Sequence, residues 1–518
     1  MSLFSGIGGL DLGLERAGLE VIAQCEIWDS ARSVLSDHWT AVPLGHDVTD
    51  FEAPACDVLA AGFPCTDISH VGRRAGIGGP QSGLVSEVFR IAQEANPRWI
   101  VLENVTNLLT LHQGAGMDYI TMQLEALGYD WAYRTVDARF TGLPQKRLRV
   151  IILASKIDGD ATTLLTENAS EPPTSQLDGH SAAAGFYWTE GRSGVGLVQS
   201  AVPTMKGGST IGLPSAPAVW YPSNPVGRRF VLPSIAAGEQ LQGLPVGWTD
   251  PALHTGNRDQ RWKLLGNAVP VPIGEWIGSR LQATPANVDS LAREPLDRNK
   301  RWPRAGYGGR SGAWAVPATT WPRSTPLRPL REIVDPDSSE PLSHRAVTGF
   351  LSRLDQSGLP VPDDFYADLE RHQVATRPKL TIATGWDPVN SKARSKRAGN
   401  PELALRNALT QHGLRYRLQY RVLPDRKSRV DVAFVGARVA INIRKCFWYA
   451  CPTHGGQPSD AAARWEAKIA KNVARDAESV RRLEDAGWLV FVLWEHDDPA
   501  DLATSIAAVV AQRSRQAS

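Results

Sequence analysis

The amino-acid sequence predicts an α/β protein in which a doubly wound domain is followed by a second, smaller α/β unit. Over the first 155 residues, short apolar runs alternate with amphipathic stretches, which is the pattern of βαβ units. The same alternation returns after about residue 387, and 518 residues are too many for one ordinary domain. With 42% hydrophobic residues, the composition is typical of a globular chain, and no apolar run approaches the about 20 residues of a membrane span. The start of the chain has no signal-peptide pattern, so we expect a cytoplasmic protein without a membrane partner.

The elements of the first domain follow from the positions of the apolar residues. We expect the sheet to be parallel. Residues 156–233 lose the period and are rich in Gly, Ser, Thr and Pro, as functional loops are. Helical spacing at 234–244 and 271–281 closes the domain. Residues 282–386 are rich in Pro and Trp and contain one predicted helix, at 344–357. They are expected to connect the first domain to the next unit or to form part of the first domain. The predicted strands of residues 1–155 are 21–26, 58–61, 99–103 and 149–154, and the predicted helices are 30–38, 82–96 and 117–127.

The second unit spans residues 387–518. It is predicted to contain helices at 401–412 and 460–486 and strands at 430–435, 439–443 and 488–494. The net charge of +2 indicates no partner, but between Lys392 and Arg429 basic residues greatly outnumber Glu402 and Asp425. Such a cluster is either a solvated surface or a contact for nucleic-acid phosphates.

Glycines near the start of the chain indicate a cofactor site. Gly6, Gly8 and Gly9 lie where a first strand would turn into a first helix, which lets a ligand approach the backbone, although tight packing also favours glycine there. Glu26 ends the next predicted strand, where it is placed for a ribose hydroxyl, and Asp47 ends a further element, where it is placed for a base. Together they predict a cofactor that contains a nucleoside.

Reactive side chains follow other strands of the same predicted sheet. Cys65 comes soon after the strand at 58–61, Glu103 ends the next strand, and Arg147 and Arg149 directly precede the last one. Because ligands bind at the carboxyl ends of strands in open α/β sheets, we expect these groups to converge at one edge. An isolated cysteine is more often a small buried hydrophobe than a nucleophile, and the five cysteines, an odd number, do not form a disulfide framework.

In this order, and together with residues 266–270, these pieces resemble the DNA (cytosine-5) methyltransferases over residues 1–281. The resemblance implies a Rossmann-like fold in which the Cys65 thiolate adds to carbon 6 of cytosine and makes carbon 5 nucleophilic. Glu103 then acts at ring nitrogen 3, and Arg147 and Arg149 orient the base and the acid. The implied methyl donor is S-adenosylmethionine. Its binding residues by resemblance are Phe4, Gly6, Gly8, Gly9, Glu26, Asp47, Val48, Pro64, Leu84 and Asn267.

The same resemblance implies how the substrate is handled. The target cytosine must leave the helix, so residues 66–84 resemble the mobile loop that closes over a flipped base, and residues 156–233 take the place of the target-recognition region. Double-stranded DNA is the implied partner, and a cognate restriction endonuclease is compatible with it. Methylation of RNA stays open as an alternative, because some relatives of the family act on tRNA.

The second unit carries a possible metal site. Cys446, Cys451, His454 and His496 offer the ligand types of tetrahedral zinc, although spacing alone leaves the fourth ligand open. Residues 387–497 resemble the very short patch repair endonucleases, which nick DNA at T:G mismatches, and this implies a restriction-endonuclease-like fold with zinc on those four residues. By resemblance, Asp431 is the magnesium ligand. The aromatic side chains that would enter the base stack are Phe447, Trp448 and Trp465.

Three positions depart from the pattern of that second family. Arg444 stands where an acidic residue or histidine is expected, Lys445 where glycine is usual, and Tyr449 where a histidine should help activate water. An arginine beside Asp431 competes with a divalent cation, and tyrosine is a poor base at neutral pH. The second unit is therefore either a mismatch endonuclease or a DNA-binding, mismatch-recognising domain with a degenerate nuclease site.

Overall fold

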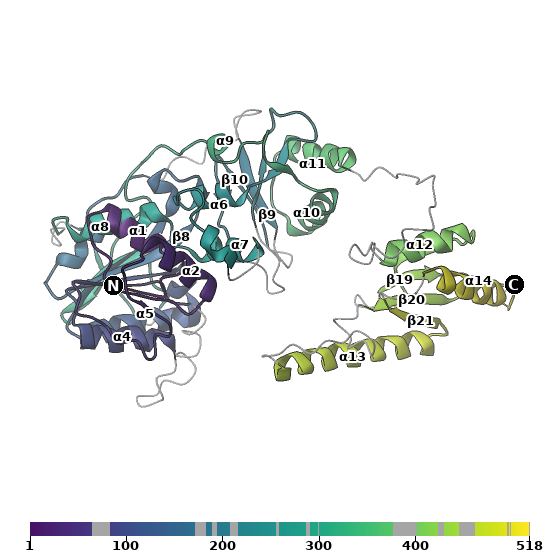
Figure 1. Ribbon diagram of the computed structural model, residues 1–518, viewed down its shortest axis with the longest axis horizontal. Helices are drawn as coiled ribbons and strands as arrows, with labels where there is room; N and C mark the ends of the chain where they lie inside the picture. The colour runs from purple at the N-terminus through teal and green to yellow at the C-terminus, as the bar shows by residue number, and fades with distance from the viewer. Residues whose placement is uncertain are drawn as a thin grey trace. The chain divides into compact units, whose positions relative to one another are not determined.

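The computed structural model describes residues 1–64, 83–170, 183–188, 194–207, 216–254, 258–285, 291–298, 300–376, 401–422, 429–444, 462–494, 497 and 499–516. The chain divides into two compact units, Met1–Leu380 and Thr381–Ser518 (Figure 1). None of the helices in these described ranges is long and apolar enough to cross a membrane.

A ten-stranded sheet forms the centre of the first unit, in the order β14-β16-β15-β6-β8-β5-β4-β1-β2-β3. Its strands β3, β2, β1, β4 and β5 are parallel, as the sequence predicted, and the remaining strands are antiparallel. The strand predicted at 149–154 therefore does not continue the parallel sheet, because the connection from β6 to β8 is too short for a crossover and sends β8 back. The bounds are Ser2–Leu3 (β1), Gln24–Cys25 (β2), Leu44–Gly45 (β3), Val58–Ala61 (β4), Trp99–Val105 (β5), Asp130–Asp137 (β6), Leu148–Ser155 (β8), Glu294–Pro295 (β14), Ala305–Gly309 (β15) and Gly312–Ala315 (β16).

Helices cover both faces of this sheet, which confirms the predicted doubly wound arrangement (Figure 1). On one face, α4 (Leu84–Ala95) and α5 (Ala115–Ala126) pack against strand residues such as Ile100 and Leu102. On the other, α1 (Gly9–Arg16) and α8 (Val271–Leu281) pack against Val101 and Ile151. Successive residues of β5 thus alternate between two buried layers, which explains its uninterrupted apolar run. A third cluster joins α2 (Asp29–His38), the 3₁₀ helix η5 (Asp250–His254) and α7 (Arg258–Asn267).

Much of the region expected to be irregular forms a second sheet, in the order β10-β9-β12-β13-β17. Helices α10 (His344–Ser357) and α11 (Asp363–Ala375) pack on one face through Phe350 and Phe365. Helices α6 (Ile235–Leu241) and α9 (Leu330–Ile333) pack on the other. The strands are β9 (Ala184–Trp188), β10 (Val195–Gln199), β12 (Ala218–Trp220), β13 (Phe230–Leu232) and β17 (Glu340–Pro341), and β11 (Val202–Pro203) pairs with β7 (Gln145–Lys146).

Of the two roles expected for residues 282–386, a connector or part of the first unit, the described residues 282–376 have the second. They add β14, β15 and β16 to the central sheet, and β17, α10 and α11 to the second one. Without them β6 and β13 would be open edges that expose unpaired backbone groups. These short strands are rich in Gly, Pro and Trp and show no alternation of apolar and polar residues. The sequence therefore did not predict them as strands.

The second unit contains a four-stranded sheet, in the order β18-β19-β20-β21. Helices α12 and α14 bury Leu409 and Ile506 on one face, and α13 buries Leu483 on the other. The predicted helices and strands are confirmed within a few residues, whereas β18 and α14 were not predicted. The bounds are Pro401–Gln411 (α12), Arg417–Arg421 (β18), Arg429–Phe434 (β19), Val439–Arg444 (β20), Ala462–Asp485 (α13), Leu489–Trp494 (β21) and Pro499–Gln516 (α14).

Candidate active site

The predicted acid and one of the predicted arginines form a buried pair. Glu103 lies in β5 and Arg149 at the start of β8, where the register sets them diagonally on the same face of the sheet. Arg149 Nε is 2.7 Å from Glu103 Oε1, and both side chains are about nine-tenths buried. Burial lowers the pKa of Arg149, and the Glu103 carboxylate opposes that shift. The carboxylate is thus held in one orientation at the predicted edge of the sheet.

The chain that leads to Cys65 starts beside this pair. Asn104 Nδ2 donates a hydrogen bond of 3.0 Å to the carbonyl of Phe63. A methyl group added at Gly62 would lie 3.6 Å from Glu103 Oε2. Pro64 is exposed, and Cys65 and residues 66–82 lie outside the described residues. The structure therefore brings the end of β4 to Glu103, while the position of the thiol stays a prediction.

Arg147, which was expected to help orient the base and the acid, contacts backbone carbonyls in the structure. Its side chain is buried and donates hydrogen bonds to the carbonyls of Met205 (3.0 Å), Gly266 (3.0 Å) and Ala268 (2.8 Å). Burial and then the charge of Arg149 lower the pKa of Arg147. None of the hydrogen bonds described for its guanidinium involves Glu103. Arg147 therefore links the start of β8 to the segment after β11 and to residues 266–268.

The glycine-rich turn between β1 and α1 adopts a backbone that favours glycine. Gly6 and Gly8 have φ values of 57° and 74°, and Phe4, with a φ of 54°, shares this left-handed region. A Cβ at Gly9 would lie 2.2 Å from the carbonyl oxygen of Val269, whereas one at Gly6 would meet nothing within 4 Å. Gly9 therefore allows the turn to contact residues 266–270, and the space beside Gly6 is open.

The two acids predicted to bind the nucleoside differ in their surroundings. Glu26 is buried, and its carboxylate accepts hydrogen bonds from the backbone N–H groups of Gly6 (2.7 Å) and Trp28 (2.9 Å). Asp47 accepts two hydrogen bonds from Thr49, through its N–H and its hydroxyl, and these hold the pKa of Asp47 below its usual value. The Glu26 carboxylate thus contacts the glycine-rich turn directly, while Asp47 is at the surface.

The remaining predicted cofactor residues lie on several elements. Asn267 is exposed at the end of α7, and a Cβ at Gly207 would lie 2.5 Å from its Oδ1. Val48 is buried in the core, and Leu84 begins α4 half-buried. Of these, only Asn267 presents an exposed polar side chain, and Val48 and Leu84 contribute to packing.

Sequence reasoning missed two side chains next to Glu26. Ile27 and Trp28 are 52% and 37% exposed, which is unusual for large apolar groups. The Lys263 ammonium, from α7, lies 3.9 Å from the centre of the Trp28 ring. The sequence shows only that two apolar residues directly follow Glu26, which ends a predicted strand. It does not show that their side chains are exposed, because exposure depends on the fold.

These residues fit S-adenosylmethionine. A buried, oriented carboxylate suits a ribose diol, an exposed apolar residue suits a flat base, and the open space at Gly6 admits a ligand against the backbone. The glycines, Glu26 and residues 266–270 belong to one contiguous part of the first unit, although they are far apart in the sequence.

In the second unit the described residues do not fit the implied magnesium site. Asp431 Oδ1 accepts from Gln419 Nε2 (2.9 Å), and Oδ2 accepts from the backbone N–H of Ile443 (2.7 Å). Arg444 pairs with a second carboxylate, because its Nη2 and Nε lie 2.5 and 2.7 Å from Asp476 Oδ2. Sequence reasoning missed Asp476, which lies 32 positions away. One carboxylate is thus held by protein donors and the other is neutralised.

The structure does not describe the predicted zinc ligands. Cys446, Cys451, His454 and His496, with Phe447, Trp448, Lys445 and Tyr449, lie outside the described residues, as does the side chain of Trp465 in α13. Among the described residues no group of three or more His, Cys, Asp or Glu side chains is arranged for a metal ion. The zinc site remains a prediction.

Comparisons with known proteins assign both units. Residues 1–184 match the family of C-5 cytosine-specific DNA methylases, and residues 387–453 match the DNA mismatch endonuclease Vsr. The type II methyltransferase M2.BsuMI of Bacillus subtilis (strain 168) is 41% identical over 386 residues, which cover 72% of this chain and 97% of that protein. The type II nicking enzyme V.NaeI of Lentzea aerocolonigenes is 39% identical over 123 residues, 23% of this chain and 72% of that protein. Among solved structures, the S. pombe Dnmt2 methyltransferase has a TM-score of 0.40 at 16% identity, over 54% of this chain and 97% of that one. The chain therefore belongs to the C-5 cytosine-specific DNA methyltransferases and carries a Vsr-like domain at its C-terminal end.

Proposed function

We propose that the first unit transfers the methyl group of S-adenosylmethionine to carbon 5 of a cytosine flipped out of a specific duplex DNA sequence. One observation carries the proposal: the Glu103–Arg149 pair is buried directly beside the end of β4, from which the chain continues to Cys65. The similarity to type II DNA methyltransferases supports duplex DNA as the acceptor and a cognate restriction endonuclease as a companion activity.

The residues divide the chemistry between them. The Cys65 thiolate forms a bond to carbon 6 of cytosine, and the electron pair of the 5,6 double bond becomes available at carbon 5. In its protonated form, Glu103 donates a hydrogen bond or that proton at ring nitrogen 3, which withdraws electron density and favours the addition. Arg149 fixes the orientation of Glu103. After methyl transfer, a water molecule acting as a base takes the proton of carbon 5, the C–H electron pair restores the 5,6 double bond, and Cys65 leaves carbon 6 as a thiolate.

Residues near the glycine-rich turn would hold the cofactor. When bound, S-adenosylmethionine supplies an electrophilic methyl group. Glu26 would accept from the ribose hydroxyls, Ile27 would cover one face of the adenine, and Asn267 would contact the ligand from the opposite side. Phe4, Gly6 and Gly9 shape the backbone that the ligand lies against.

Bisulfite sequencing tests the proposal directly. The wild-type chain and its Cys65→Ala variant are expressed in cells that lack other cytosine methylation, and their DNA is sequenced. We expect protected cytosines within one short motif for the wild type and none for the variant. Protection that persists in the variant would contradict the role of Cys65. Transfer of labelled methyl groups to RNA, but not to DNA, would instead favour the RNA alternative.

For the second unit we propose recognition of T:G mismatches in duplex DNA without strand cleavage. The ion pair between Arg444 and Asp476 carries this proposal, together with the protein hydrogen bonds that occupy Asp431. Zinc on Cys446, Cys451, His454 and His496 would stabilise the fold, and Phe447, Trp448 and Trp465 would enter the base stack. V.NaeI is named a nicking enzyme, so cleavage is the competing possibility.

An end-labelled duplex with one T:G pair separates the two possibilities. With magnesium present, we expect tighter binding than to the matched T:A duplex and no nicked product. A nick next to the mismatch would refute the non-cleaving assignment. Elemental analysis of the purified chain, with Cys451→Ser as control, should find one zinc ion in the wild type and less in the variant.

A further inference from the structure

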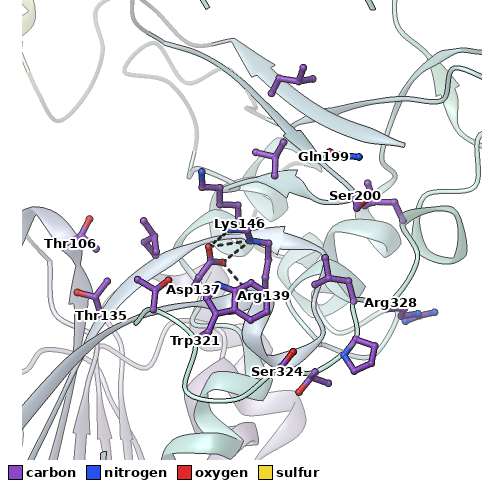
Figure 2. Close-up of a pocket in the computed structure, with 18 of the residues that line it drawn as sticks. Thr106, Thr135, Asp137, Arg139, Lys146, Gln199, Ser200, Trp321, Ser324 and Arg328 are labelled. Atoms are coloured by element: carbon purple, nitrogen blue, oxygen red, sulfur yellow. Dashed lines mark hydrogen bonds and ion pairs between the residues drawn. The ribbon is translucent and has the colours of Figure 1, made fainter. Parts of the chain in front are cut away.

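A cavity of about 1370 Å³ lies beside the central sheet (Figure 2). Asp137 and Leu148, which are paired in the sheet, both line it. Glu103 and Arg149 point to the opposite face, because successive residues of a strand alternate between the two faces. They share the face that α1 and α8 cover. The cavity is therefore separated from the catalytic pair by the sheet, and the glycine-rich turn that leads into α1 lies on the catalytic side.

The backbone of the glycine-rich turn must be held in place by its surroundings. Phe4, Gly6 and Gly8 all have left-handed φ values, between 54° and 74°. A left-handed φ is unfavourable for a residue with a side chain, such as Phe4, and it persists at ligand sites only where neighbouring structure fixes it. Contacts that fix this turn therefore determine the backbone shape that a cofactor meets.

One such contact comes from Trp248, in the loop between α6 and η5. Its indole Nε1–H donates a hydrogen bond of 2.8 Å to the carbonyl oxygen of Ile7, which is 241 positions away in the sequence. Both residues are buried, and Ile7 lies between the two left-handed glycines Gly6 and Gly8. Because a buried carbonyl without a donor is unfavourable, this hydrogen bond favours the observed position of the turn.

Aromatic side chains at the end of α2 hold the Trp248 ring. The His38 ring stacks on it with centroids 3.5 Å apart and planes at 8°, and His38 Nε2 lies 2.9 Å from the Trp248 carbonyl oxygen. The Trp39 ring meets Trp248 edge-on at 5.7 Å. A Cβ at Gly8 would lie 2.4 Å from an atom of the Trp39 ring. The indole is thus fixed in its plane, and Trp39 also packs against the turn.

Glu239 fixes the backbone on both sides of Trp248. It lies fully buried in α6, and its carboxylate accepts hydrogen bonds from the N–H groups of Gly247 (2.7 Å) and Thr249 (2.8 Å). The Thr249 hydroxyl donates a further hydrogen bond of 2.6 Å to Glu239. Arg261 of α7 compensates the buried charge, because its Nη2 lies 3.0 Å from Glu239 Oε1, and its Nε donates to the Thr249 hydroxyl (2.7 Å). Buried polar contacts therefore join the loop that carries Trp248 to α6 and α7.

We propose that Trp248 is a positioning residue for the cofactor. Its indole N–H holds the Ile7 carbonyl, and with it the left-handed backbone against which the cofactor lies, while the buried ion pair between α6 and α7 keeps Trp248 in place. The inference rests on the proposed binding of S-adenosylmethionine at this turn. It assigns a role in cofactor binding to a residue outside residues 1–184, which match the methylase family.

A residue that only fills the core would not depend on its N–H group. Trp248→Phe keeps an aromatic ring beside His38 and removes the donor to Ile7. The matched control is Trp262→Phe, which makes the same substitution in the same hydrophobic cluster, at a ring that packs against Gly238 of α6. Both variants lose the same volume, so a difference between them reports the contact with the turn.

Two measurements on the full chain test the proposal. Calorimetry measures the binding of S-adenosylhomocysteine, the product left when the cofactor has lost its methyl group, and hydrogen–deuterium exchange measures the protection of the backbone amides of residues 4–9. We expect the affinity of Trp248→Phe to fall roughly fivefold to tenfold, which is the effect of one lost hydrogen bond to a buried carbonyl. Exchange of residues 4–9 should be faster in this variant, and saturating ligand should slow it again. Trp262→Phe should stay within about twofold of the wild-type affinity.

Methyl transfer separates positioning from a general loss of structure. With unmethylated genomic DNA as acceptor, Trp248→Phe should raise KM for S-adenosylmethionine and keep kcat within about twofold, because the contact with the turn is the same before and during the reaction. If Trp248→Phe does not fold, Thr249→Val replaces it. That variant removes one hydroxyl from the contacts of Glu239, and the same direction of change is expected in ligand affinity and in exchange of residues 4–9.

Two results would overturn the inference. One is equal affinity of Trp248→Phe and Trp262→Phe for S-adenosylhomocysteine. The other is faster exchange throughout the first unit of Trp248→Phe instead of in residues 4–9, which would make Trp248 a general core residue. If the wild type binds the ligand and the two variants do not differ, only this inference fails; if the wild type binds no ligand and transfers no methyl group, the proposed function fails.

Discussion

Arg147 offers a quantitative test of how the first unit is held together. Replacing it with methionine keeps most of the aliphatic volume and removes the donors to the carbonyls of Met205, Gly266 and Ala268. Each carbonyl left buried without a donor costs about 1–3 kcal/mol. The variant also removes a buried charge, whose desolvation is unfavourable, so the net loss is smaller than the sum. We expect Arg147→Met to lower the free energy of unfolding of the first unit by about 3–5 kcal/mol.

Urea titration followed by circular dichroism measures this loss. Because the chain has two units, the transition of the first unit is identified by its shift when S-adenosylhomocysteine is added, since a ligand stabilises only the unit that binds it. Lys146→Met is the control, because Lys146 is adjacent but exposed and should change stability by less than about 0.5 kcal/mol. If Arg147→Met unfolds at the wild-type urea concentration, the three hydrogen bonds do not stabilise this junction.

Three further variants test individual contacts. Gly9→Ala should strongly weaken the binding of S-adenosylhomocysteine measured by calorimetry, because the added methyl group would lie 2.2 Å from the Val269 carbonyl oxygen. The control is Gly349→Ala, whose methyl group would have no atom within 4 Å, and it should bind the ligand as the wild type does. Glu103→Gln should lower kcat for methyl transfer by about 10²–10⁴ while cofactor affinity is unchanged, and an unchanged kcat would remove Glu103 from the mechanism. Burial raises the pKa of Asp11 to about 6, so the folded chain keeps a proton that the unfolded chain loses near pH 4. The free energy of unfolding should therefore fall by up to about 3 kcal/mol as the pH rises from about 4 to 6, and Asp11→Asn should flatten this part of the profile; an equally steep profile in the variant would refute the assignment.

The sequence predicted the residues of the candidate site better than it predicted their contacts. Strand β4 was placed at its observed bounds because its apolar run is flanked by clear breaks. Glu103 and Arg149 were expected at one edge, and their direct pairing depends on the antiparallel register of β5 and β8, which joins residues 46 positions apart. The carbonyl partners of Arg147 lie up to 121 positions away. Periodicity reports local structure, so it does not specify which distant carbonyl an arginine reaches.

The same limit explains two features that the sequence did not specify. Residues 282–376 complete the edges of two sheets, and pairing of edge strands is set by partners that are remote in sequence. Arg444 was expected beside Asp431 because the family pattern brings those positions together. In the fold, α13 presents Asp476 to Arg444, and a carboxylate at 2.5 Å determines where the guanidinium lies. A family pattern predicts which positions lie in the site. It does not predict the partner of a residue that differs from the pattern, as Arg444 does.

The joining of these two units in one chain makes a further prediction. Deamination of 5-methylcytosine leaves thymine opposite guanine, so the product of the first unit can become the ligand of the second. If both units contact the same DNA, the first raises the effective concentration of the second near its site. We expect the full chain to bind a T:G pair within its own methylation motif at least tenfold more tightly than a T:G pair in a scrambled sequence. Matched duplexes of both sequences provide the control for binding by the first unit alone. If the preference for T:G over the matched pair is the same in both sequences, the two units act independently and their fusion reflects shared expression instead of shared substrate.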